Sequence, residues 1–271
     1  MKPPLDGTVL VTGASSGIGR ELARLFAPRA KRLILVARRE ERLHALAGEL
    51  GRPGLDIAVH PCDLTDSAAV DRLLAEIGEV DVLVNNAGIG DVGLFENVSW
   101  ERIDFLLRIN ITAVAQLIHR LLPGMLRRRS GGILNISSGW GLTFIPGMGL
   151  YSGAKHFVTA FTECLRLELH GTGVVVTQVC PGPVATEFVE VAGNPTGHDI
   201  PKIFLLSPER CARAAFRGFE RGRAMVIPSF RAWFLIALGR VSPRWLLRAV
   251  YFWIGGWLRK RPPPAPAAEK P

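Results

Sequence analysis

The sequence is poor in cysteine and lacks the cysteine patterns that bind metals or build disulfide frameworks. No two cysteines form a C-x-x-C pair, and none has metal-ligand spacing with the six histidines. We therefore predict that the protein has no metal site and that its cysteines are reduced core residues of a cytoplasmic protein. The four cysteines are Cys62, Cys164, Cys180 and Cys211.

The chain also lacks a recognisable signal peptide and any internal repeat longer than a strand–helix unit. Residues 1–7 carry Pro3 and Pro4 and lead straight into a predicted strand. This start agrees with a cytoplasmic location.

Acidic residues are scarce at the C-terminal end, and this scarcity explains most of the net charge of +9. Residues 228–271 hold eight Lys/Arg and only Glu269 as an acid, which gives +7 and leaves +2 for residues 1–227. Because the main body is nearly neutral, a general nucleic-acid-binding surface is not expected. We predict no nucleic-acid partner.

The C-terminal segment has no apolar run long enough to span a membrane. Its uncharged stretch, Ala249–Leu258, has ten residues, whereas a spanning helix needs about 20. Tryptophan and arginine beside an apolar run suit a membrane interface instead. We expect residues 229–261 to form apolar and basic helices, and residues 262–271 to be a disordered Pro-rich tail. The tryptophans of this segment are Trp233, Trp245, Trp253 and Trp257, and Arg259, Lys260 and Arg261 follow them.

Three roles for residues 229–261 remain open at this stage. The helices would contact the inner face of a membrane peripherally, close over a substrate pocket as a lid, or pack against a second subunit.

Residues 1–228 show the regular alternation of strands and helices that predicts one α/β domain. The composition, 48% hydrophobic and 21% charged, is typical of a globular protein. Such alternation predicts a doubly wound parallel sheet in three α/β/α layers with right-handed crossovers. The predicted strands are 8–12, 32–36, 56–61, 81–84, 131–137, 174–180 and 224–227.

A glycine-rich turn follows the first predicted strand and precedes a predicted helix. Glycines at such a turn let the backbone approach a pyrophosphate, and the helix N-terminus offers free N–H groups. This context predicts a dinucleotide-binding site rather than a structural turn. The predicted contacts are Gly13, Ser15, Ser16, Gly17, Ile18 and Gly19.

The end of the second strand carries Arg38 and Arg39 where an NAD enzyme usually carries an acid. Arginine suits a 2′-phosphate, so we predict NADP(H) as the cofactor. The alternative is a solvated helix start, although helix N-termini favour acids over arginines. After the third strand, Asp63 is interpreted as an acceptor for an adenine amino group, or as a helix cap, and its neighbour Leu64 as a further cofactor contact.

Three residues around the fifth strand predict a proton-donating site. Tyr151 and Lys155 are four residues apart, so a helix places them on one face. Ser138 lies thirteen residues earlier, at the end of that strand. A nearby cation is expected to lower the pKa of the Tyr151 phenol from its ordinary value of about 10. Asn110, inside a long predicted helix, is interpreted as a kink that presents polar groups to this site.

Together these motifs resemble the short-chain dehydrogenase/reductase family over about residues 6–228. The motifs are Thr12–Gly19, Asn85–Gly88, Asn110, Ser138, Tyr151 with Lys155, and Pro181-Gly182. The resemblance implies a Rossmann-type fold, an NAD(P)(H) cofactor, and a dimer or tetramer. It assigns Tyr151 as proton donor or acceptor, Ser138 as the group that polarises the carbonyl, Lys155 as the ribose contact, and Asn110 as support for a water relay. The further cofactor contacts that it implies are Asn86, Ala87, Gly88, Pro181, Gly182, Val184 and Thr186, and Tyr151 is expected to contact the cofactor as well.

We therefore expect an NADPH-dependent oxidoreductase that interconverts a lipophilic carbonyl and an alcohol, with Ser138 and Tyr151 also contacting substrate. The lipophilic preference rests on apolar residues between Ser138 and Tyr151 and on the tail. Two alternatives stay open: an NAD-dependent alcohol dehydrogenase of the same family, and a non-catalytic NADP(H)-sensing protein at a membrane or partner.

Overall fold

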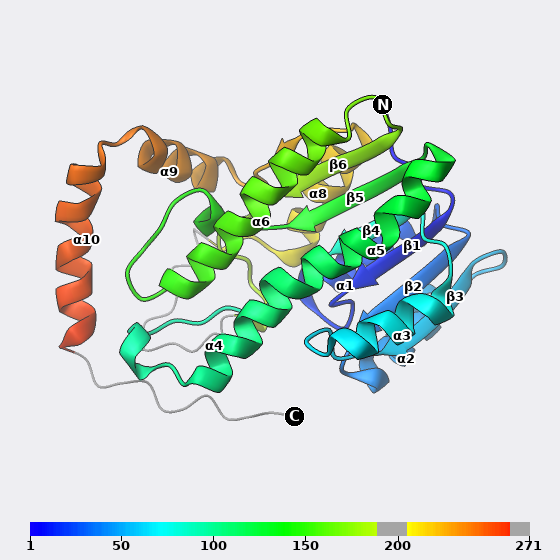
Figure 1. Cartoon of the computed structure of the whole chain (residues 1–271), viewed down its shortest axis with the longest axis horizontal. Helices are drawn as coiled ribbons and strands as arrows, with labels where there is room; N and C mark the ends of the chain where they lie inside the picture. Colours follow the sequence, from blue (N-terminus) through cyan, green and yellow to red (C-terminus); the bar gives the residue numbers. More distant parts are fainter. Residues whose placement is uncertain (189–204, 261–271) are drawn as a thin grey trace.

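A seven-stranded parallel sheet forms the centre of the molecule. The computed structural model describes residues 1–188 and 205–260 (Figure 1). The strand order is β3-β2-β1-β4-β5-β6-β7, and every neighbouring pair is parallel. This order confirms the predicted Rossmann-type doubly wound sheet. The strands are β1 Thr8–Thr12, β2 Arg32–Ala37, β3 Asp56–Pro61, β4 Val82–Asn85, β5 Gly131–Ile136, β6 Val174–Val179 and β7 Met225–Val226.

Helices cover both faces of the sheet, because successive side chains on each strand point to opposite faces. Val9 and Val11 of β1 pack in the core with helices α1 (Gly17–Phe26), α2 (Glu40–Leu50) and α8 (Pro208–Glu220). Leu10 packs in the opposite core with α3 (Ser67–Ile77), α5 (Ala113–Arg128) and α6 (Gly149–Glu168). The predicted three-layer arrangement is therefore confirmed.

The long helical run after β4 is interrupted at Asn110. Helix α4 (Trp100–Leu107) is followed by a five-residue π-helical turn, η2 (Arg108–Thr112), and then by α5. A single π-turn inside an α-helix often marks a functional site. The structure thus confirms the predicted irregularity at Asn110.

The same run, Trp100–Arg128, is the one helical run in the described parts of the chain that is long and apolar enough to cross a membrane by length and composition. Its side chains Leu117 and Met125 pack with strand residues Ile34 and Ile133. We therefore interpret it as a core helix.

Two further helices extend the sheet domain, α9 (Phe230–Val241) and α10 (Arg244–Arg259). In Figure 1 they lie at one end of the molecule, beyond the carboxyl ends of the central strands. Short 3-10 turns lie at Phe95–Asn97 (η1) and Gly139–Gly141 (η3). The predicted disordered tail, residues 262–271, lies outside the described residues.

The cysteines are free, and burial differs among them. Cys180 and Cys211 are buried and Cys62 is half-buried, but Cys164 is exposed on α6. The expectation that all four are core residues is therefore wrong for Cys164.

Candidate active site

The predicted site residues gather at the carboxyl ends of the strands. β1 and β4 are neighbours in the sheet, and the chain crosses to opposite sides of this pair, so the strand order reverses there. In open α/β sheets a ligand binds in the crevice at such a switch point. The glycine turn follows β1, residues 86–88 follow β4, and Ser138 follows β5.

The glycine turn has a shape that requires glycine. Gly13 and Gly17 have φ of +66° and +55°, which side chains rarely adopt. A Cβ on Gly19 would lie 2.3 Å from the Gly13 carbonyl oxygen. Ser16 starts α1 without a side-chain cap, and the first turn of α1 has no acid. Free backbone N–H groups and the helix dipole at this end fit a bound pyrophosphate.

Thr12 ties this turn to the loop after β4. Its Oγ1 accepts hydrogen bonds from the backbone N–H groups of Asn86 (3.0 Å) and Ala87 (3.1 Å). It donates to the carbonyl oxygen of Val84 at 3.1 Å. The Asn86 amide in turn donates to the carbonyl oxygens of Thr12 (3.0 Å) and Gly13 (3.3 Å). The two predicted cofactor loops are therefore fixed to each other.

Ser138, Tyr151 and Lys155 are all buried at this edge. Ser138 caps the turn η3 by accepting a hydrogen bond from the Trp140 N–H at 3.2 Å. Tyr151 and Lys155 lie one turn apart on α6. The Lys155 ammonium donates to the Ile136 carbonyl oxygen at 3.0 Å, which fixes its position at the end of β5.

Burial controls the protonation of the pair. It raises the pKa of Tyr151 to about 12, against a smaller lowering by hydrogen bonding with Ser138. It lowers the pKa of Lys155 to about 8. The expected lowering of the Tyr151 pKa by Lys155 is therefore wrong for this state of the protein, because burial disfavours the charged form of both groups. At neutral pH the Tyr151 phenol holds its proton and is ready to act as an acid.

Asn110 reaches the same site from η2. It is fully buried, and its amide donates to the Ile89 carbonyl oxygen at 2.8 Å. Its Oδ1 has no partner among the described residues. A Cβ on Gly88 would lie 2.6 Å from this Oδ1 and 3.4 Å from Lys155 Nζ. The side-chain Oδ1 of Asn110 and the Lys155 ammonium therefore both lie beside Gly88. This arrangement fits a polar ligand or a water between them.

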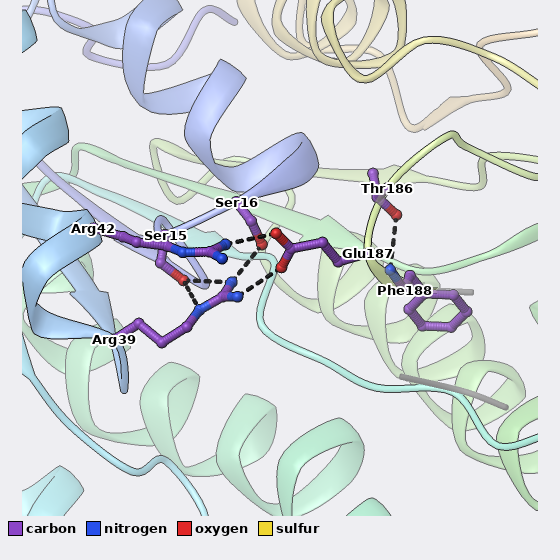
Figure 2. Close-up of polar contacts among 7 residues, drawn as sticks. All are labelled: Ser15, Ser16, Arg39, Arg42, Thr186, Glu187 and Phe188. Carbon is purple, nitrogen blue, oxygen red and sulfur yellow. Dashed lines mark hydrogen bonds and ion pairs between the residues drawn. The ribbon is translucent and has the colours of Figure 1, made fainter. Parts of the chain in front are cut away.

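A charged cluster lies over the glycine turn (Figure 2). Arg39, at the start of α2, donates to the hydroxyl oxygens of Ser15 at 3.1 Å and Ser16 at 2.8 Å. The Glu187 carboxylate bridges two cations, with 2.6 Å to Arg39 and 2.6 Å to Arg42. These hydrogen bonds hold the pKa of Glu187 below its ordinary value.

The structure separates Arg38 from this cluster. Its guanidinium lies over the ring of Phe105, 5.5 Å from the centroid.

Asp63 accepts hydrogen bonds from the backbone N–H and hydroxyl of Thr65 at 2.9 and 2.8 Å. Asp66, not Asp63, caps α3, so the interpretation of Asp63 as the cap is wrong.

The remaining predicted contacts lie along the loop after β6, with two exceptions. Leu64 is buried in the core that contains Leu10, and Ile18 packs, partly buried, against the core on the opposite face of the sheet. The Pro181 carbonyl oxygen accepts from the Gly139 N–H at 2.7 Å, next to Ser138. A Cβ on Gly17 would lie 2.9 Å from Thr186 Cγ2, so this loop lies against the glycine turn. It also contains Gly182 and Val184.

Sequence reasoning missed Arg42, Glu187 and Phe188. Arg42 lies three residues after Arg39, a spacing that places both on one helix face and that was a usable signal. Glu187 is separated from Arg39 by 148 residues, so no local pattern links them. The Phe188 ring lies 5.4 Å from the Tyr151 ring, and this contact also has no sequence signal.

Comparison with known proteins agrees with this arrangement. The family model of the short chain dehydrogenases matches residues 7–195. The chain belongs to the short-chain dehydrogenase family. It is therefore an oxidoreductase by family, and the resemblance carried by the motifs from Thr12 to Gly182 is confirmed.

Individual relatives extend the likeness to most of the chain. A ketoacyl reductase, HetN, from Nostoc is 32% identical over 259 residues, covering 92% of this chain and 89% of that protein. A Sphingobium yanoikuyae short-chain dehydrogenase in complex with NADPH has a TM-score of 0.77 at 32% identity, covering 98% of this chain and 99% of its own. A Burkholderia phymatum family member in complex with NAD has a TM-score of 0.76 at 25% identity, covering 87% and 93%.

Proposed function

We propose that this short-chain dehydrogenase is an NADPH-dependent reductase of carbonyl groups. The observation that carries the proposal is the buried group of Ser138, Tyr151 and Lys155 beside a glycine turn that fits a dinucleotide. The intact trio argues against a non-catalytic NADP(H)-sensing protein.

The chain's own residues provide proton transfer and orientation. A reduced nicotinamide, when bound, supplies the hydride. Tyr151 donates its phenolic proton to the carbonyl oxygen, and the Ser138 hydroxyl stabilises the negative charge that develops there. Lys155 would hold the ribose of a bound cofactor, and Asn110 would support the return of a proton toward Tyr151.

The proposed preference for NADPH is supported by Arg39 and Arg42, two cations beside the glycine turn that would suit a ribose 2′-phosphate. The Sphingobium relative was solved with NADPH and the Burkholderia relative with NAD. An NAD-dependent alcohol dehydrogenase is therefore the second candidate. It is favoured by Glu187, an acid beside the same position.

The substrate is proposed to be lipophilic. The segment between Ser138 and Tyr151 is rich in apolar side chains, and α9 packs against it: a Cβ on Gly139 would lie 2.9 Å from Ile236 Cδ1. The Nostoc relative is named a ketoacyl reductase. The apolar side chains are Leu142, Phe144, Ile145, Met148 and Leu150.

NADPH and NADH consumption with a carbonyl panel tests the proposal. The panel runs from small diketones to long-chain ketoacyl, steroid and retinal compounds. Turnover of long apolar carbonyls with NADPH supports it. Turnover confined to small polar carbonyls removes the lipophilic part, and absence of turnover with every carbonyl, with NADPH still bound, supports the sensor instead.

We also propose that α9 and α10 contact an anionic membrane surface, with the enzyme cytoplasmic and peripheral. The side of α10 toward the domain packs through Tyr251, 5.4 Å from the Phe144 ring, and through buried Leu258. Its outer side exposes Trp245, Phe252 and Trp253 at 70%, 81% and 80%. A soluble monomer rarely exposes so many large apolar side chains together.

The charge of this segment favours a membrane over a second copy of the chain as the proposed partner. Residues 229–260 contain six cations and no Asp or Glu. Arg259 is already paired with Glu96, with 2.8 Å between Nη1 and Oε1. Two copies packed through this segment would bring the other like charges together, whereas an anionic lipid surface attracts a cation near it by about 1 kcal/mol. The cations are Arg231, Arg240, Arg244, Arg248, Arg259 and Lys260.

Co-sedimentation of the full chain with phosphatidylserine-containing vesicles tests this contact. We expect binding that pure phosphatidylcholine vesicles do not support, and that the double variant Phe252→Gln, Trp253→Gln loses. Leu167→Gln, at an exposed apolar site on α6, is the control. Loss of a dimer in the double variant, without any vesicle binding by the parent, would assign the face to a second copy.

A further inference from the structure

We infer that Glu187 sets the cofactor preference, by competing with the 2′-phosphate of NADP(H) for Arg39 and Arg42. This inference rests on the proposed dinucleotide site and adds to it an acid that the motifs do not include.

The carboxylate already occupies the positions that a 2′-phosphate would use. Its two oxygens each lie 2.6 Å from a guanidinium nitrogen, one on Arg39 and one on Arg42. Figure 2 shows both guanidinium groups directed at Glu187 beside the hydroxyls of Ser15 and Ser16. A carboxylate and a phosphate present the same kind of oxygen acceptors to arginine.

Charge balance opposes the binding of both anions at once. Arg39 and Arg42 provide two positive charges, and a 2′-phosphate carries about −1.5 to −2 at neutral pH. A phosphate and the Glu187 carboxylate together would exceed the two cations. In this proposal Glu187 leaves its arginines when NADP(H) binds, and part of the phosphate binding energy is lost in breaking those ion pairs.

The competition is weak enough for the phosphate to win. The side chains of Glu187, Arg39 and Arg42 are 40%, 39% and 50% exposed, and exposed ion pairs are individually weak. NAD(H) carries a hydroxyl at this position and no extra charge. In that complex Glu187 keeps its arginines and accepts a hydrogen bond from the ribose hydroxyl, as an acid does in NAD enzymes.

Glu187 also lies in the segment that reaches the catalytic tyrosine. The Phe188 N–H donates to Thr186 Oγ1 at 3.3 Å, and the Phe188 ring lies 5.4 Å from the Tyr151 ring. Glu187 is therefore the immediate neighbour of Phe188, whose ring packs beside Tyr151, so a displacement of Glu187 would be felt next to the catalytic tyrosine.

Binding measurements on the full chain test the inference. Dissociation constants for 2′,5′-ADP, 5′-AMP, NADPH and NADH are measured for the parent, Glu187→Gln and Glu40→Gln. Glu40→Gln is the matched control, because it removes one acid from the first turn of α2 that pairs with a different residue. Glu40 Oε1 lies 3.5 Å from His44 Nε2. We expect Glu187→Gln to bind 2′,5′-ADP and NADPH about tenfold more tightly and 5′-AMP and NADH no more tightly.

Three results would overturn it: equal tightening of all four ligands, equal tightening in Glu40→Gln, or an unchanged NADPH to NADH affinity ratio in Glu187→Gln. Arg39→Ala separates this failure from that of the proposed cofactor site. If Arg39→Ala lowers the ratio and Glu187→Gln leaves it unchanged, the NADPH site stands and Glu187 has no part in it. If neither changes the ratio, both proposals fail.

Discussion

The Nζ atom of Lys155 lies 5.8 Å from the centre of the Tyr151 ring, and both side chains are buried. Burial raises the pKa of Tyr151 and lowers the pKa of Lys155, because it disfavours the charged form of each group: the phenolate of Tyr151 and the ammonium of Lys155. At neutral pH the phenol is therefore neutral, and Lys155 is still mostly protonated but loses its proton more easily than an ordinary lysine. This state suits proton donation, the direction required for carbonyl reduction.

The ionisation of Tyr151 is directly observable because the chain has only two tyrosines. In Tyr251→Phe, which keeps the ring beside Phe144, the phenolate absorbance reports Tyr151 alone. We expect the titration midpoint near the pKa of about 12 that burial gives Tyr151, with most of the phenol still neutral at about pH 11, where an ordinary phenol is mostly ionised. A midpoint below 10 would show that Lys155 outweighs burial.

The stability of the free protein should depend on pH through Lys155. Its pKa falls from 10.5 in the unfolded chain to about 8 in the folded one, so between these values the unfolded state binds more protons. Stability from this group is lowest below pH 8 and rises toward pH 10.5. Tyr151, with its pKa raised from 10.0 to about 12, acts oppositely above pH 10.

Lys155→Met removes this dependence. Relative to the variant, the free energy of unfolding of the parent should rise by about 2 kcal/mol between pH 7 and pH 10. Denaturant unfolding at both values measures it. A constant difference between parent and variant would mean that Lys155 is not desolvated in the folded state.

Replacing Gly88 by alanine should lower turnover. In Gly88→Ala the new Cβ would lie 2.6 Å from Asn110 Oδ1, so Asn110 or the loop must move. We expect turnover to fall by about tenfold or more and stability by about 1–3 kcal/mol. Gly93→Ala is the control, because a Cβ there meets nothing within 4 Å. Equal effects of the two substitutions would indicate that loop stiffness, not the approach to Asn110, matters.

Thr12→Val should separate the two cofactor loops. It keeps the shape of a buried side chain but leaves the N–H groups of Asn86 and Ala87 without their acceptor, at a cost of about 1–3 kcal/mol. We expect lower thermal stability and weaker NADPH binding together. Thr8→Val, at the other end of β1, is the comparison, since its hydroxyl makes no hydrogen bond among the described residues. Unchanged NADPH affinity in Thr12→Val would remove the loop connection from cofactor binding.

Local patterns were sufficient for the fold and for the residues that meet at the strand ends. Apolar strands such as Thr8–Thr12, glycines with positive φ and the Tyr151–Lys155 spacing each reflect a short-range physical requirement. Asn110 was located for a similar reason, since an amide inside a helix diverts backbone hydrogen bonds, although the π-turn itself was not foreseen.

Features that depend on long-range contact were missed or wrong. Glu187 and Arg39 are 148 residues apart in the sequence, so no local spacing of residues predicts their ion pair. The sign of the Tyr151 pKa shift depends on how deeply the phenol is buried, a quantity that only the packed structure provides. Arg38 and Arg39 are adjacent in sequence, yet one lies over Phe105 and the other over the glycine turn.

The most direct test of the account measures turnover and NADPH affinity on the same preparation of Tyr151→Phe, with the carbonyl that the parent reduces fastest. We predict that turnover falls by at least about a hundredfold, because the proposed catalytic acid is removed. The NADPH dissociation constant should stay within about twofold, since the phenol oxygen is lost and the ring that packs against Phe188 is kept. Turnover equal to that of the parent, with NADPH bound equally well, would contradict the assignment of Tyr151 as the catalytic acid.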